Sequence, residues 1–404
     1  MRDIPRIISV DDHVIEPPHV WQTWLPRNLR ARGPRVVRDT YGVEWVDGNQ
    51  VFRRGGDGPL TDWWEYGDFA WCHQMLNACA GYKEDEWWMG PISFDQMRPG
   101  CFEVAARLAD MDRNHVEASL CFPTYPRFCG QLFNEQPDRA LALACIRAYN
   151  DWMVEEWAGE SGGRLVPLCL IPLWDPQLAA DEVRRNAARG VRAVAFSELP
   201  GRLGLPTIHD PSGHWNAFFA ACDETRTAVF LHIGSGSHWI TSSPDAPPVV
   251  TATLVFTTSV VSLTDWLFSG VLARYPNLRV CFAEGQIGWI PYVLERADNL
   301  WSKAVWARDG QRLPRAPSTY MNQVYACFFD DLTGLDARDT IGIDQLTFET
   351  DYPHQDSTWP RTLDAVRSFA DRLDDIELAK VLRGNAARLL GRDLTSSSTT
   401  EEPS

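Results

Sequence analysis

The feature that most constrains the fold of this chain is a recurring alternation of short apolar runs with longer amphipathic segments. Eight runs have the length and the β-branched or aromatic content of buried strands. Segments with helical periodicity separate most of them, such as 102–113, 177–189, 213–224, 260–274 and 290–303. Strands that alternate with helices predict βα units and a parallel sheet. The eight runs are Arg6–Val10, Ala118–Phe122, Leu165–Ile171, Val191–Phe196, Ala228–Leu231, Leu278–Phe282, Val324–Phe329 and Leu346–Glu349.

Eight βα units predict an α/β protein with a closed (β/α)8 TIM barrel. Such a barrel commonly needs about 250 residues or more, and this chain has 404. The alternative is a doubly wound open sheet. That fold would be favoured by a glycine-rich phosphate loop after a strand, and the sequence contains no Gly-x-Gly-x-x-Gly or Walker motif.

Most of the additional length lies between the first and second predicted strands, in residues 19–101. This insertion contains the tryptophans at 63, 64, 71, 87 and 88 and has turn signals over 53–59. We expect it to lie across the barrel mouth as a cap, although each tryptophan taken alone is more simply explained by packing within the cap. Residues 395–404 are polar and of low complexity, which predicts a disordered tail after a single domain spanning 1–394.

Charge and composition exclude several classes of partner. The net charge of −16 argues against binding to nucleic acid or to an anionic membrane. The first nine residues contain no apolar core of signal-peptide length, so we expect a cytoplasmic protein. The apolar stretch 249–263 is too short to span a bilayer and is expected to be a buried helix or loop. The 10 cysteines include no Cys-x-x-Cys pair, which predicts reduced core residues and not a disulfide framework.

Titratable side chains occur at the ends of four of the predicted strands, and this is where a barrel of this type carries its active site. Strand one ends in Asp11-Asp12-His13, strand five in His232, strand six in Glu284, and strand eight in Glu-Thr-Asp351-Tyr-Pro-His354.

Asp11 and His13 are two residues apart, so both can face the barrel interior, whereas Asp12 faces away and is expected to be structural. Imidazoles and carboxylates that converge from several strands form a plausible site for a divalent metal. Each residue also has a simpler explanation: Asp11 as a turn residue, His232 as a hydrogen-bonded core histidine. The metal hypothesis therefore depends on the set and not on any one member.

At these positions the sequence resembles the amidohydrolase superfamily, specifically the amidohydrolase 2 family, which includes aminocarboxymuconate-semialdehyde and γ-resorcylate decarboxylases. The motifs that carry the resemblance are "SVDDHVIEPP", "FLHIGSGS", "FAEGQIGWIPYVLERAD", "FETDYPHQDSTWP" and "VLRGNAARLLG". It covers about residues 5–392. The resemblance implies one divalent ion bound by Asp11, His13, His232 and Asp351. One position departs from the pattern: Glu284 stands where the family often has a histidine.

What the resemblance implies for activity is the non-oxidative decarboxylation of a small aromatic or unsaturated carboxylic acid. A metal would orient the substrate carboxylate as a Lewis acid. Asp351 would donate a proton to the carbon that loses CO2, Glu284 could raise the pKa of Asp351, and Arg127 could hold a second anionic group. His238 and His354 could contact the substrate, although both could equally be loop residues. The resemblance also implies a homodimer.

Two other functions remain open. The same metal could generate a hydroxide that hydrolyses an amide, a lactone or a carbon–carbon bond. Alternatively, the barrel could be a non-catalytic binding protein. We expect Zn²⁺ as the ion, with Mn²⁺ or Mg²⁺ as alternatives that the oxygen-rich set of ligands would also suit.

Overall fold

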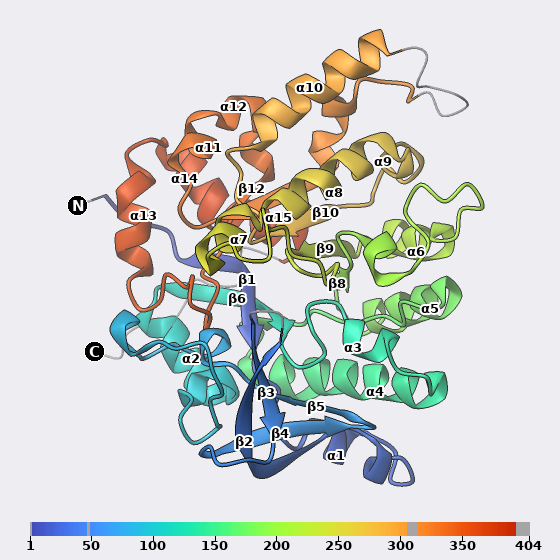
Figure 1. The fold of residues 1–404 in the computed structure, drawn as a ribbon. Helices are drawn as coiled ribbons and strands as arrows, with labels where there is room; N and C mark the ends of the chain where they lie inside the picture. Colours follow the sequence, from blue (N-terminus) through green and yellow to red (C-terminus); the bar gives the residue numbers. More distant parts are fainter. Residues whose placement is uncertain (1, 47–48, 305–312, 393–404) are drawn as a thin grey trace.

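The computed structural model describes residues 2–46, 49–304 and 313–392, and eight of its strands form two parallel sheets (Figure 1). The first sheet has the order β1-β6-β7 and the second has the order β12-β11-β10-β9-β8. Every pairing within both sheets is parallel. The eight strands are β1 (Ile7–Val14), β6 (Val116–Pro123), β7 (Leu165–Val166), β8 (Ala193–Phe196), β9 (Ala228–His232), β10 (Val280–Ala283), β11 (Val324–Phe328) and β12 (Leu346–Phe348).

The eight predicted strand positions are therefore confirmed, although the bounds of several strands differ from the predicted ones and the third strand differs most in proportion to its length. The third run, expected over 165–171, pairs as a strand only at its first two residues. The chain then passes Pro167 and Pro172, and proline lacks the N–H group that a ladder needs. One isolated parallel bridge, between Cys169 and Val194, links this segment to β8.

Hydrogen bonds also connect the other ends of the two sheets, where β12 meets β1. The Asp351 N–H donates to the Asp11 carbonyl at 2.9 Å, and the His13 N–H donates to the Tyr352 carbonyl at 2.6 Å. The residues that follow β12 are thereby fixed against the middle of β1. This contact brings the two most distant chemical motifs of the sequence together.

Helices lie between the strands and cover their outer faces (Figure 1). Local sequence explains where several begin: the Asp175 side chain accepts hydrogen bonds from the first turn of α5, and Pro176 occupies its first position. The helices are α1 (Val20–Trp24), α2 (Val104–Arg113), α3 (Gln131–Asn134), α4 (Arg139–Trp152), α5 (Pro176–Ala187), α6 (Asn216–Thr225), α7 (Pro248–Leu254), α8 (Thr257–Phe268), α9 (Val271–Arg274), α10 (Ile290–Lys303), α11 (Leu332–Asp336), α12 (Arg338–Ile341), α13 (Thr362–Ala370), α14 (Asp375–Ala379) and α15 (Asn385–Leu389).

Between β1 and β6 the chain forms a separate antiparallel sheet, seen at the bottom of Figure 1. Its order is β3-β2-β4-β5, built from β2 (Arg35–Val46), β3 (Asn49–Arg54), β4 (Leu60–Tyr66) and β5 (Phe69–Cys72). Trp63 and Trp64 are buried, and the Trp64 ring stacks on Tyr125 with their centroids 4.5 Å apart. Trp88 is largely exposed. The tryptophans of this segment therefore have different environments, and two of them attach the sheet to the rest of the molecule.

The apolar stretch at 249–263 differs from expectation. Among the described residues, one helical stretch, Pro248–Phe268, is long and apolar enough to cross a membrane by length and composition alone, with 21 residues and a mean hydropathy of 1.3. Core helices of soluble proteins pass the same test. The expectation of a buried segment was wrong for α7, which contains no buried residue, whereas one face of α8 is buried.

All ten cysteines are free and buried, as the sequence predicted. The predicted disordered tail, 395–404, lies outside the described residues.

Candidate functional site

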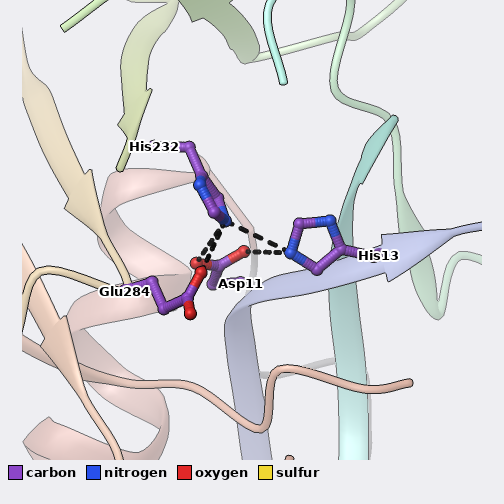
Figure 2. A group of neighbouring side chains, drawn as sticks. All are labelled: Asp11, His13, His232 and Glu284. Carbon is purple, nitrogen blue, oxygen red and sulfur yellow. Dashed lines mark hydrogen bonds and ion pairs between the residues drawn. The ribbon is translucent and has the colours of Figure 1, made fainter. Parts of the chain in front are cut away.

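Four titratable side chains meet at the carboxyl ends of β1 and β9 and just after β10 (Figure 2). The His232 Nε2 atom lies 3.2 Å from His13 Nε2, 3.5 Å from Asp11 Oδ2 and 3.2 Å from Glu284 Oε2. His13 Nε2 lies 3.6 Å from Asp11 Oδ1. One ligand atom from each residue falls within 4.8 Å of the other three, which is the arrangement that a metal ion requires.

Asp351 belongs to a second group that overlaps the first. Its Oδ1 atom lies 3.3 Å from His13 Nε2 and 3.2 Å from His354 Nδ1. One ligand atom from each of His13, Glu284, Asp351 and His354 also lies within 4.8 Å of the other three. The His354 ring stacks on His13 with their centroids 3.6 Å apart. The structure thus places three of the four predicted ligands in one group and the fourth, Asp351, beside it.

Both acidic residues that follow a strand end have unusual backbone geometry. Glu284 has a φ of +58° and Asp351 a φ of +47°, in the left-handed region that non-glycine residues rarely adopt. Residues held in such conformations are found mostly at functional sites, because the surrounding structure must offset the strain. For Asp351 the N–H bond to Asp11 contributes to that restraint.

Asp11 and Asp351 are fully buried carboxylates whose surroundings differ. Neither oxygen of Asp11 accepts a hydrogen bond, and the imidazoles of His13 and His354 lie next to Asp351 Oδ1. Among the described residues, no Lys or Arg forms an ion pair with Asp11, Glu284 or Asp351. A buried carboxylate without a partner is costly. The cluster therefore fits a divalent cation, which would supply the missing positive charge.

Burial and the neighbouring charges shift the pKa values of the residues in this cluster. Burial, followed by repulsion from Glu349 and Asp351, raises the pKa of Asp11 well above its usual value. Burial would also raise the pKa of Asp351, but His354 and His13 reverse this effect and lower it, so the expectation that Glu284 raises this pKa was wrong. Burial lowers the pKa of His232 to about 4. Its imidazole is therefore neutral at pH 7, which is the form that binds metal.

Neighbouring groups fix the orientation of His232. Its Nδ1 atom lies 2.6 Å from the Ile233 carbonyl, which leaves Nε2 facing the cluster. The Phe128 ring stacks on the imidazole with their centroids 4.1 Å apart and their planes 9° apart. Gly234 allows this close approach, since a Cβ there would come within 2.7 Å of Trp239 and 3.1 Å of Phe128. Phe128 had no predicted role, and no local motif marks it.

Glu349 is a further buried carboxyl beneath the cluster to which the sequence analysis assigned no role. It accepts a hydrogen bond from the Glu284 N–H at 3.1 Å and contacts the Cys327 thiol. Burial raises its pKa to about 8. A signal was present in the sequence, because Glu349 precedes Asp351 by two residues and can therefore share its face of the strand.

Asp12 has the structural role that its position predicted. Its carboxylate accepts hydrogen bonds from the Thr350 hydroxyl at 2.5 Å, from the Tyr352 N–H at 3.0 Å and from Ser119. These bonds join β1, β6 and the segment after β12. Asp12 therefore fixes β1, which carries Asp11 and His13, against its two neighbours.

A cavity of about 280 Å³ adjoins the cluster. His13 and His354 form one part of its wall, and Asn77, Thr124 and Arg127 add polar groups. Its aromatic lining comes from Phe69, Trp71, Tyr125 and Phe128. Since Phe69 and Trp71 belong to β5, the segment between β1 and β6 supplies part of the wall.

Of two residues predicted to contact the substrate, Arg127 lines the cavity and His238 does not. Arg127 lines the cavity, but its guanidinium already forms a bidentate pair with Glu135, at 2.6 and 2.9 Å. His238 lies half-buried in the loop after β9 and is not among the described residues that line this cavity. Arg127 is therefore positioned to influence a ligand in the cavity, and the role of His238 stays a prediction.

Comparison with known proteins is consistent with this geometry. A family model described as amidohydrolase matches residues 19–392. The γ-resorcylate decarboxylase of Rhizobium sp. (strain MTP-10005) is 25% identical over 343 residues, which cover 79% of this chain and 95% of that protein.

Solved structures show the same fold. An amidohydrolase from Mycobacterium avium subsp. paratuberculosis K-10 superposes with a TM-score of 0.67 at 22% identity, over 97% of this chain and 99% of that one. A dihydroxybenzoic acid decarboxylase from Polaromonas sp. JS666, solved with manganese and 2-nitroresorcinol, gives a TM-score of 0.58 at 21% identity, over 73% and 88% of the two chains. The chain thus has the α/β fold of known amidohydrolases.

Proposed function

Because this chain belongs to the amidohydrolase family, we propose that it is a metal-dependent decarboxylase of a small aromatic or unsaturated carboxylic acid. The observation that carries the proposal is the group formed by Asp11, His13, His232 and Glu284, in which the buried Asp11 oxygens accept no hydrogen bond and His13 lines an aromatic cavity. The γ-resorcylate and dihydroxybenzoic acid decarboxylases among the similar proteins support the choice of reaction.

We propose that Asp11, His13, His232 and Asp351 hold one divalent ion, with Glu284 beside them. The bound ion would act as a Lewis acid toward the substrate carboxylate and an adjacent oxygen. The carboxylate-rich donor set suits Mn²⁺ or Mg²⁺ as well as Zn²⁺, and the Polaromonas enzyme was solved with manganese. We therefore favour Mn²⁺ over the Zn²⁺ that the sequence first suggested.

The residues of the chain would then position the substrate and move one proton. The aromatic walls of the cavity would hold the ring and exclude water. Asp351, which starts ionised, would take a proton from Nδ1 of the protonated His354, which is left as a neutral imidazole, and deliver it to the ring carbon as the carboxylate departs as CO2. The His232–Ile233 bond would keep the imidazole Nε2 directed at the site.

Four broader features remain proposals. We propose that the two parallel sheets close into one (β/α)8 barrel, which the links at Cys169–Val194 and Asp351–Asp11 support. The barrel would form a single domain over 1–394, with 19–101 as a cap over the cavity. A cytoplasmic homodimer stays a prediction from sequence and resemblance. A small organic acid would be the substrate.

The test compares metal content and product formation in wild type, His232→Ala and Asp351→Asn. Elemental analysis should find about one divalent ion per wild-type chain and less in both variants, and CO2 release should accompany turnover. Amide or lactone hydrolysis without CO2 would support the alternative that the family description suggests. If no ion binds after reconstitution with Mn²⁺ and Zn²⁺, the proposal is wrong and a non-catalytic barrel becomes the better description.

A further inference from the structure

The cavity next to His13 and His354 has one permanently charged cation on its wall, and that cation is already paired. Among the described residues that line the cavity, Arg127 is the single Lys or Arg. Both of its terminal nitrogens donate to the Glu135 carboxylate, from Nη1 to Oε1 at 2.6 Å and from Nη2 to Oε2 at 2.9 Å. A bidentate pair of this kind uses the face of the guanidinium that would otherwise receive a carboxylate.

The loop that carries Arg127 is fixed independently of this ion pair. The Arg127 N–H donates to the Thr124 carbonyl at 3.1 Å, and its φ of +61° closes a tight turn after β6. The buried Glu16 carboxylate accepts the N–H groups of Thr124 and Tyr125, at 3.0 and 2.8 Å. We therefore expect the loop to keep its shape when the Arg127–Glu135 pair is removed.

The remaining surroundings of the cavity disfavour a second negative charge. On the side of the cluster lie the carboxylates of Glu284, Asp351 and Asp356, and Asp351 raises the pKa of Asp356 further after burial. On the other sides lie aromatic rings and the uncharged side chains of Asn77 and Thr124, which offer an anion no compensating charge. One substrate carboxylate could be neutralised by the bound ion. A second would meet uncharged walls, acidic neighbours and an arginine already neutralised by Glu135.

We propose that this cavity selects aromatic acids with one carboxylate, and that Glu135 is the specificity-determining residue because it neutralises Arg127. The proposal rests on the proposed function, in which a metal ion receives the first carboxylate. It also reassigns Arg127: the guanidinium does not hold a second anionic group in the native protein, but it could do so without Glu135.

The test measures binding of two probes to the Mn²⁺-loaded protein by isothermal titration calorimetry. The probes are 2-hydroxybenzoate, with one carboxylate, and 2-hydroxybenzene-1,3-dicarboxylate, with two. The variants are Glu135→Gln, Arg127→Gln and the double variant. Glu224→Gln serves as a matched control, because Glu224 forms a similar surface pair with Arg184 and lies outside the cavity lining.

Wild type should bind the monocarboxylate more tightly. Glu135→Gln should improve the affinity for the dicarboxylate relative to the monocarboxylate by roughly fivefold, which is the upper range for a partly exposed ion pair. The double variant should lose this gain, since no free guanidinium remains, and Glu224→Gln should not produce it. A gain that requires Arg127 cannot arise from a general loss of structure.

Two results would overturn the proposal alone: equal binding of both acids by wild type, or an unchanged ratio in Glu135→Gln. If neither acid binds although elemental analysis finds Mn²⁺ in the same sample, then the charge selectivity and the substrate class of the proposed function both fail. If wild type holds no Mn²⁺, the metal-dependent function fails first, and the selectivity that depends on it falls as well.

Discussion

Two parts of this site differ in how their charges are compensated: the floor, which is the buried cluster of Asp11, His13, His232, Glu284 and Asp351, and the wall, which is the lining of the cavity. On the floor, Asp11 is fully buried and its oxygens accept no hydrogen bonds, and Asp351 is fully buried next to the imidazoles of His13 and His354. On the wall, Arg127 forms a bidentate pair with the neighbouring Glu135, and 34% and 46% of the two side chains are exposed. A partly exposed pair is solvated and contributes about 0–1 kcal/mol, whereas a buried carboxylate without a compensating charge costs several kcal/mol. The floor therefore fits a ligand that brings positive charge, and the Arg127–Glu135 pair is where we propose that selectivity is set.

The largest expected effect comes from removing a carboxylate of the floor. Asp11→Asn should weaken Mn²⁺ binding by at least about 100-fold, because outer partners of a ligand alone are typically worth 10–100-fold. The same substitution should stabilise the metal-free protein by about 1–3 kcal/mol, since it removes a buried charge that is repelled by its neighbours. Calorimetric Mn²⁺ titration and chemical unfolding measure the two quantities. Lower stability of the metal-free variant would contradict this account of the floor.

The second prediction concerns the support beneath the floor. Glu349→Leu should weaken Mn²⁺ binding by about 10–100-fold, because Glu284 would lose the acceptor of its N–H bond. Glu349→Gln retains an acceptor oxygen, so its affinity for Mn²⁺ should stay within a few fold of the wild-type value. Mn²⁺ titrations of the two variants side by side make the comparison. Similar losses of Mn²⁺ affinity in both variants would show that metal binding depends on the charge of Glu349 and not on its hydrogen bond.

The third prediction concerns the aromatic wall. Phe128→Leu removes the ring stacked on His232 while it keeps an apolar side chain of similar size. The ring also lines the cavity, and its contact with the ring of a bound aromatic acid would be worth about 0.5–1.5 kcal/mol beyond the buried area, so KM for such an acid should rise by roughly 2- to 12-fold. Metal content should stay at the wild-type level. Steady-state kinetics on metal-loaded protein measures the change in KM. A loss of bound metal would instead show that Phe128 supports metal binding through His232.

The fourth prediction, which does not depend on a bound ligand, is a slope in stability with pH. Burial raises the pKa of Glu198, which accepts the Gly234 N–H, to about 8. A carboxyl with a raised folded-state pKa binds more protons in the folded state, so its contribution is complete below the unfolded value and is lost as the pH rises toward 8. His232, with a folded pKa of about 4, acts in the opposite direction, but only below its unfolded value near 6.5. Between pH 6.5 and 8, metal-free protein should therefore lose stability.

Glu198→Gln should flatten that slope by up to about 1.4 kcal/mol per pH unit, the value for one proton. Glu224→Gln, at an exposed position, should leave the slope as it is. Urea unfolding at several pH values in the presence of a chelator provides the measurement. A slope that is unchanged in Glu198→Gln would show that Glu198 is ionised in the folded protein.

The positions of the strands and much of the cluster could be predicted from the sequence. The short apolar runs and their alternation with helical segments located all eight parallel strands. This works because a buried parallel strand is a short apolar run regardless of which strands it pairs with. The i, i+2 spacing placed Asp11 and His13 on one face and Asp12 on the other, because successive side chains of a strand alternate. The polar residues at the ends of the predicted strands pointed to His232, Glu284 and Asp351, the resemblance assigned ligand roles to His232 and Asp351, and the structure places all three beside the pair.

Only the tertiary structure decided what surrounds these residues. Phe128 stacks on His232 from more than 100 positions away along the chain, and Glu135 pairs with Arg127 through the path of a loop. Glu349 became a support of Glu284 because β12 lies next to β11 and near the end of β10. Periodicity is a local property that the chain carries by itself. Distances between side chains on different strands depend on register and loop path, which packing of the whole fold determines.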